Sequence, residues 1–106
     1  MGQPACLDPV EALGAIQRLL DEGDETLGYT THARDRMVER HVTADDVIHV
    51  LRCGMVTSSS WNEVFRNCSY EVSGRDCDRA PLAVVVALQP AMCRITLITV
   101  KDTRHD

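Results

Sequence analysis

A histidine and two arginines follow one another at helical spacing in the first half of the chain, as His32, Arg36 and Arg40. At about 100° per residue, Arg36 lies about 40° and Arg40 about 80° around a helix from His32, so all three side chains share one face. Glu39, about 20° to the other side, could hold an arginine or orient the imidazole. Imidazole takes and gives protons near neutral pH, and arginine binds phosphate. Such a set is suited to metal-independent RNA cleavage, in which a base removes the proton of a ribose 2′-hydroxyl, but the spacing alone is not diagnostic of that reaction.

The same spacing has a structural interpretation. A solvated helix face with internal ion pairs shows this pattern, and such pairs contribute only about 0.2–0.5 kcal/mol each. His32 could instead stand at the helix start and hydrogen-bond the sheet. Further cations close the chain: Lys101 and Arg104 could line a phosphate site, with Thr99 and Lys101 on one side of a strand and Val100 on the other. A frayed, solubilising terminus is the alternative for these two residues.

Other chemistry-bearing residues give weaker signals. Trp61 and Phe65 stand in a stretch predicted to be irregular, residues 58–66, where one could stack on a base or cap the core edge. His41, His49 and Cys53 include no tight ligand pair, so we expect no metal site and no cofactor.

The charge of the chain is unevenly distributed. The 106 residues carry a net charge of -5, and all of that deficit lies in residues 1–26, with six acids and one base. The remaining 80 residues hold ten acids and ten bases, nine of them arginine. Composition therefore does not exclude an RNA ligand, although an acidic N-terminal arm slows the approach of RNA. We expect removal of residues 1–26 to tighten RNA binding at low salt.

The cysteines and the apolar runs indicate in which cellular compartment the protein is expected. Five cysteines, an odd number without a Cys-x-x-Cys pair, do not indicate a disulfide framework. The chain does not open with a basic and then apolar stretch, and its longest apolar run, residues 81–88, is too short to span a bilayer. We expect a cytoplasmic protein with no membrane partner.

Capping residues and periodicity predict three helices. The first runs from a cap at Asp8 to a stop at Gly23, with one apolar stripe that either packs on the body or docks a partner. Residues 24–28 are predicted as a polar linker. The second helix is capped at Thr30 or Thr31 and runs to about Arg40, and the third begins at Thr43 with a capping box and ends before Gly54.

The second half of the chain changes to β-rich runs. Strands are expected at residues 55–57, 67–73, 81–88 and 94–100, and the last three suggest an antiparallel meander with the apolar 81–88 run at its centre. Helices followed by strands predict an α+β fold, with N-terminal helices packed on an antiparallel sheet of three to four strands.

Several segments match one family pattern in order. They read THARDRMVER at 31–40, VTADDV at 42–47, GMV at 54–56 and YEVSG at 70–74, followed by the 81–86 and 95–100 strands. Over about residues 29–102 the chain resembles a bacterial family of unknown function, number 4258. The resemblance divides the chain into an acidic helix and linker, residues 1–28, and a domain, residues 29–106.

That resemblance implies a fold similar to the RelE and BrnT toxins of bacterial toxin-antitoxin pairs, which often cleave RNA. It implies an antitoxin protein and RNA as partners, and it makes the cations at the strand end, Lys101 and Arg104, candidates for substrate binding. Because one fold hosts several functions, a non-catalytic module that binds a protein or its own copy is the alternative.

Overall fold

Each helix begins at a residue whose side chain caps it. The computed structural model describes residues 6–23, 26–63, 66–89 and 93–101, and its helices are α1 Pro9–Glu22, α2 Thr31–Arg40 and α3 Ala44–Cys53. Asp8, Thr30 and Thr43 each accept a hydrogen bond from a backbone N–H of the first turn. The three helices predicted from the sequence are confirmed. None of these described helices has the length and apolar character needed to cross a membrane.

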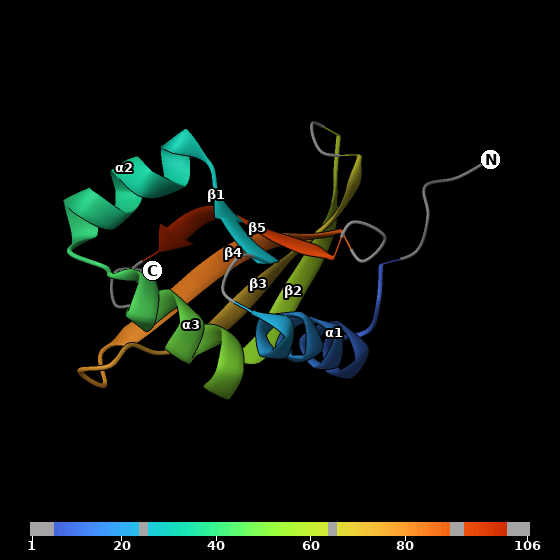
Figure 1. The fold of residues 1–106 in the computed structure, drawn as a ribbon, viewed down its shortest axis with the longest axis horizontal. Coiled ribbons are helices and arrows are strands. Elements are labelled where there is room, and N and C mark those ends of the chain that lie inside the picture. The colour runs from blue at the N-terminus through green and yellow to red at the C-terminus, as the bar shows by residue number, and fades with distance from the viewer. Residues whose placement is uncertain (1–5, 24–25, 64–65, 90–92, 102–106) are drawn as a thin grey trace.

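The strands of the described residues form one open sheet in the order β1-β5-β4-β3-β2 (Figure 1). They are β1 Leu27–Tyr29, β2 Met55–Asn62, β3 Asn67–Arg75, β4 Pro81–Gln89 and β5 Arg94–Lys101. Strands β2 to β5 pair antiparallel in chain order, whereas β1 pairs parallel with β5. The α+β class and the central place of β4 are confirmed. The expected antiparallel sheet of three to four strands is wrong, because the sheet has five strands and is mixed.

Both differences in the sheet arise where local sequence signals are weak. β1 overlaps the segment that was predicted as a linker, because three residues with a central glycine show no alternation of apolar and polar side chains. The strand forms through the pairing of Leu27 with Ile95 and of Tyr29 with Leu97. β2 runs five residues past its predicted end at Thr57, after a bulge, and includes Trp61. Its serine-rich sequence carries little β propensity, so the pairing with β3 decides its length.

The helices cover one face of the sheet and enclose the core. In β4, Val84 and Val86 belong to the core, while the intervening Val85 faces the opposite side. α1 contributes Ile16, Leu19 and Leu20 to this same core, so its apolar stripe packs on the body of the molecule. α1 packs chiefly against β2 and α3 against β3, while α2 lies beside β5 (Figure 1).

No helix of the described residues covers the opposite face, which is lined by small and polar side chains. Ala83 and Ala87 of β4 are buried there by their neighbours and lie outside the core cluster. The Lys101 ammonium reaches across β4 to the Glu71 carboxylate of β3, at 2.8 Å between Nζ and Oε1. We call this surface the open face. It follows the pattern of an antiparallel sheet with one face packed and the other in contact with solvent.

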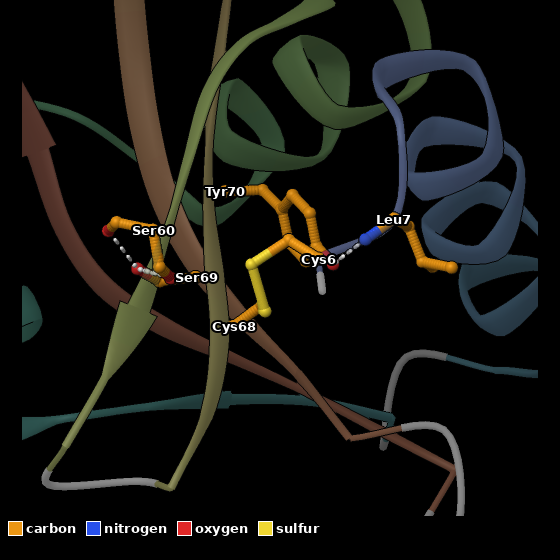
Figure 2. The surroundings of a disulfide bond; sticks show 6 residues. All are labelled: Cys6, Leu7, Ser60, Cys68, Ser69 and Tyr70. Carbon is orange, nitrogen blue, oxygen red and sulfur yellow. Dashed lines mark hydrogen bonds between the residues drawn. A yellow bond between two sulfur atoms is a disulfide. The ribbon is translucent and has the colours of Figure 1, made fainter. Parts of the chain in front are cut away.

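A disulfide joins Cys6, which precedes α1, to Cys68 of β3 (Figure 2). The Leu7 backbone N–H donates to the Tyr70 hydroxyl at 3.0 Å beside it. Figure 2 shows the disulfide and Tyr70 on one side of β3 and the Ser60 and Ser69 hydroxyls on the other. The cysteine pattern, which indicated no disulfide framework, gave no sign of this single bond. Two of the five cysteines pair across 62 positions, and a pairing at that distance leaves no local signal.

Candidate functional site on helix α2

The helix that carries the predicted site is held at the edge of the sheet by Thr30. The Thr30 N–H donates to the Leu97 carbonyl at 3.1 Å, and its hydroxyl donates to the Ile98 carbonyl at 3.2 Å. The same hydroxyl oxygen accepts from the Ala33 N–H and so caps α2. Ala33 is fully buried, so this side of α2 faces the protein and the opposite side faces solvent. The end of β1 therefore determines where α2 begins beside β5.

The predicted residues form one ridge along α2, which we call the α2 ridge: His32, Arg36, Glu39 and Arg40. His32, Glu39 and Arg40 are exposed, and Arg36 is partly buried. The Arg36 guanidinium pairs with the Glu39 carboxylate at 3.4 Å, an i,i+3 contact between two solvent-accessible groups. Such a pair contributes little to stability. The ridge is thus on the surface, with the histidine in its first turn.

The other predicted cations lie apart from this helix or beyond the described residues. Lys101 ends β5 and pairs with Glu71 on the open face, and the buried Val100 points the other way, as strand alternation predicted. Arg104 and Phe65 lie outside the described residues. Trp61, expected in an irregular stretch, belongs to β2 and is half-buried opposite Cys68.

A pocket of about 330 Å³ lies on the flank of α2 that faces away from the ridge. It is lined by Tyr29, Arg34, Met37, Val38, Val42 and Ala44. The Arg34 guanidinium carbon lies 5.5 Å from the centre of the Tyr29 ring, within the range of a cation–π contact. Val38 is 77% exposed at its rim. None of the residues that line this pocket was among the predicted site residues, although Arg34 and Val38, one helical turn apart, are a weak signal for it.

A second polar centre joins α3 to the hairpin between β3 and β4. The buried Asp46 carboxylate accepts from the backbone N–H groups of Thr43 at 2.9 Å and Cys77 at 3.0 Å. Burial raises the pKa of Asp46, but these hydrogen bonds outweigh it and hold the pKa below its ordinary value. A hydrogen bond to Asp46, then burial, then nearby carboxylates raise the pKa of the Cys77 thiol. Because the thiolate is the nucleophile, Cys77 is poorly suited to nucleophilic catalysis.

The histidines and cysteine considered for metal binding occupy separate positions. His41 ends α2 in a left-handed conformation, and Cys53 is exposed at the end of α3. His49 Nδ1 lies 2.7 Å from the Arg75 carbonyl oxygen. Across the part of the chain that the structure describes, no three His, Cys, Asp or Glu side chains come together as metal ligands would.

Comparison with known proteins places these elements in a family. No curated protein and no solved structure matches the chain. A family model described as a domain of unknown function, DUF4258, matches residues 29–102, from the end of β1 through β5. The match contains α2 with its ridge, α3 and the four long strands, and it leaves α1 outside. The chain therefore belongs to the DUF4258 family.

Proposed function

We propose that this chain is a metal-independent endoribonuclease of the RelE and BrnT toxin type, and that it contacts RNA through the α2 ridge. One observation carries the proposal: His32 is exposed in the first turn of α2, followed on the same face by Arg36 and Arg40. This arrangement combines a group that exchanges protons near neutral pH with two fixed positive charges. The likeness to these toxins rests on the sequence pattern.

In the proposed reaction the ribose 2′-oxygen attacks the adjacent phosphorus and the bond to the 5′-oxygen breaks. His32 accepts the 2′-hydroxyl proton, and the leaving 5′-oxygen takes a proton from water. Arg36 and Arg40 stabilise the charge on the phosphate oxygens, for which the planar guanidinium is well shaped. The products are a 2′,3′-cyclic phosphate and a free 5′-hydroxyl.

The state of Arg36 supports a role in which RNA replaces an existing partner. Its pair with Glu39 is exposed and long, at 3.4 Å. Phosphate competes well for such a guanidinium, because an exposed pair contributes only about 0–1 kcal/mol. Glu39 then serves to orient the arginine before RNA binds.

Expression in a bacterial host tests this function. We expect the wild-type chain to arrest growth and to fragment RNA with 2′,3′-cyclic phosphate ends. The double variant His32→Ala and Arg36→Ala should relieve the arrest. The matched control is Arg34→Ala with His49→Ala, which removes the same residue types from the pocket flank of α2 and from α3. Normal growth under verified wild-type expression would contradict the proposal. Relief of the growth arrest by the control variant to the same extent would contradict it as well.

A second function, a non-catalytic protein-binding module, is favoured by the pocket beside Tyr29. This pocket is largely apolar, and Val38 at its rim is 77% exposed, so apolar side chains surround a concave site that a partner could fill. A partner side chain inserted there would contact Met37 and Val42. The module predicts a stable complex without loss of RNA, weakened by Val38→Asp and unaffected by His32→Ala. His32-dependent cleavage by the purified protein would exclude it.

A further inference from the structure

Strand β2 is an open edge of the sheet. It pairs with β3 on one side only, and among the described residues no strand pairs with its other side (Figure 1). All residues from Thr57 to Ser60 are exposed. The opposite edge is short, since β1 has three residues and α2 then lies beside β5. β2 thus presents a long row of backbone N–H and C=O groups to solvent.

This edge lacks the features that usually prevent association between strands. Natural sheets protect exposed edges with charged side chains, proline or very short strands. β2 reads MVTSSSWN over eight residues, without a charge or a proline. Its bulge lies between Val56 and Ser58, near its start, and the pairing with β3 is regular from Ser58 to Asn62. Five of the eight residues of the strand are therefore regular and open to another strand.

Apolar groups lie near the same stretch, on the helix-covered face. Trp61 is half-buried although it belongs to the edge strand. Leu7 is 37% exposed, and its N–H donates to Tyr70, which pairs with Ser59 of β2 (Figure 2). Trp is enriched at the centres of protein interfaces. An added strand would cover Trp61 on this face and meet the serine hydroxyls on the open face.

We propose that β2 pairs antiparallel with β2 of a second copy of this chain, forming one continuous ten-stranded sheet. A twofold axis at this edge places the strand opposite itself, so an uncharged strand meets an uncharged strand and no like charges face each other. Within β2 there is no charged side chain that could give specificity for a strand of another protein. The self-complementary edge therefore fits a second copy better than a foreign segment.

The two faces of the proposed β2–β2 interface carry different side chains, and this difference restricts the register between the two strands. On the open face, Ser60 already shares a contact of 3.3 Å with the Ser69 hydroxyl of β3, and Ser58 lies on the same side beside Glu71. On the other face lie Ser59 and Trp61. The pairing with β3 fixes the face of each β2 side chain, so a slip of one residue between the copies would set the Trp61 face of one against the hydroxyl face of the other, and registers that keep both Trp61 side chains on the helix-covered face are favoured.

The full-length protein tests the proposal by molar mass in a concentration series. The wild type should reach twice its monomer mass of 11.8 kDa. Ser59→Lys, at an exposed position in the middle of the edge, places two ammonium groups near the twofold axis and should return the mass to 11.8 kDa. Ser59→Thr is the matched control, since it stays uncharged and favours strand pairing. The control should keep the doubled mass.

Amide hydrogen exchange locates the contact independently. Outward-facing amides of β2 should gain protection as wild-type concentration rises and lose it in Ser59→Lys, while β4 amides stay protected in both proteins and show that the variant is folded. A wild type that stays monomeric at all concentrations overturns the proposal. So does a doubled mass that survives Ser59→Lys, or one without protection of β2.

Discussion

Cys68 of β3 is bonded to Cys6, two residues before the Asp8 cap of α1, and the bond fastens the start of α1 to the sheet. The crosslink closes a loop spanning 62 positions, so in the chain-entropy account it removes much of the freedom of the unfolded chain. It acts on a helix whose buried face belongs to the core. The first helix is therefore tied to the body by covalent and by hydrophobic contacts.

Loss of this bond should lower stability. Cys6→Ser is expected to reduce the free energy of unfolding by about 2–4 kcal/mol, measured by denaturant titration. The control Cys53→Ser changes an exposed free thiol and should stay within about 0.5 kcal/mol of the wild type. Alkylation of the denatured protein should label three thiols before reduction and five after it. Five labelled thiols without reduction would show that the bond does not form.

The Asp46 carboxylate should make stability depend on acid pH. Its pKa in the folded protein lies below its value in the unfolded chain, which is about 3.9. The stabilisation is therefore complete above that value and is lost as the pH falls through the lower, folded pKa. Asp46→Asn removes one acceptor oxygen, should cost about 1–2 kcal/mol at neutral pH, and should flatten the acid limb of the stability profile. Asp45→Asn, an exposed neighbour, should leave that limb unchanged.

The same carboxylate should slow the chemistry of a nearby thiol. Cys53, Cys77 and Cys93 are all exposed and free. The Cys77 pKa is raised, chiefly by its hydrogen bond to Asp46, so less of it is thiolate at mildly alkaline pH. Alkylation followed by peptide mass spectrometry should find Cys77 the slowest of the three. Asp46→Asn should accelerate Cys77 alone, and equal rates at Cys53 and Cys77 in the wild type would contradict the assignment.

Two glycines should respond to alanine in opposite directions. A Cβ at Gly14 in α1 meets nothing within 4 Å, so Gly14→Ala should raise the free energy of unfolding by about 0.5–1 kcal/mol. A Cβ at Gly54 would lie 2.6 Å from the Ser73 and Val50 carbonyl oxygens, which are backbone atoms and cannot rotate away. Gly54→Ala should cost about 1–3 kcal/mol. Thermal unfolding of both variants measures the direction of each change in stability. A Gly54→Ala variant as stable as the wild type would contradict the close packing at Gly54.

Local signals explain what the sequence could and could not predict. Caps at Asp8, Thr30 and Thr43 act on the next few residues, so they marked the helix starts correctly. β1 forms only by pairing with β5, whose residues lie almost 70 positions later in the chain, and the disulfide of Cys6 requires Cys68 of β3. Neither contact leaves a signal in the neighbouring sequence. For the site, helical spacing correctly placed His32 and Arg36 on one side of α2. It could not show that Lys101 of β5 pairs with Glu71 of β3, because that contact reaches across β4 between residues 30 positions apart.

The structure changes how the acidic N-terminal charge must be tested. Deleting residues 1–26 would remove Ile16 and Leu19 from the core together with Cys6, so loss of folding would mask any effect on RNA. The exposed acids at the end of α1 offer a cleaner change, since Asp21→Asn with Glu22→Gln removes two charges and leaves the core intact. Asp21 also pairs with the Arg52 guanidinium at 2.9 Å, so the variant frees a cation.

If RNA is the ligand, that double variant should bind single-stranded RNA more tightly at low salt. The gain comes from reduced repulsion between acid side chains and phosphates, and it should shrink as salt shortens the screening length towards about 3 Å at 1 M. Stability should change little, because the lost Asp21 pair is exposed and acids near a helix C-terminus oppose its dipole. Equal binding by wild type and variant at low salt would show that the α1 charges do not act on the ligand.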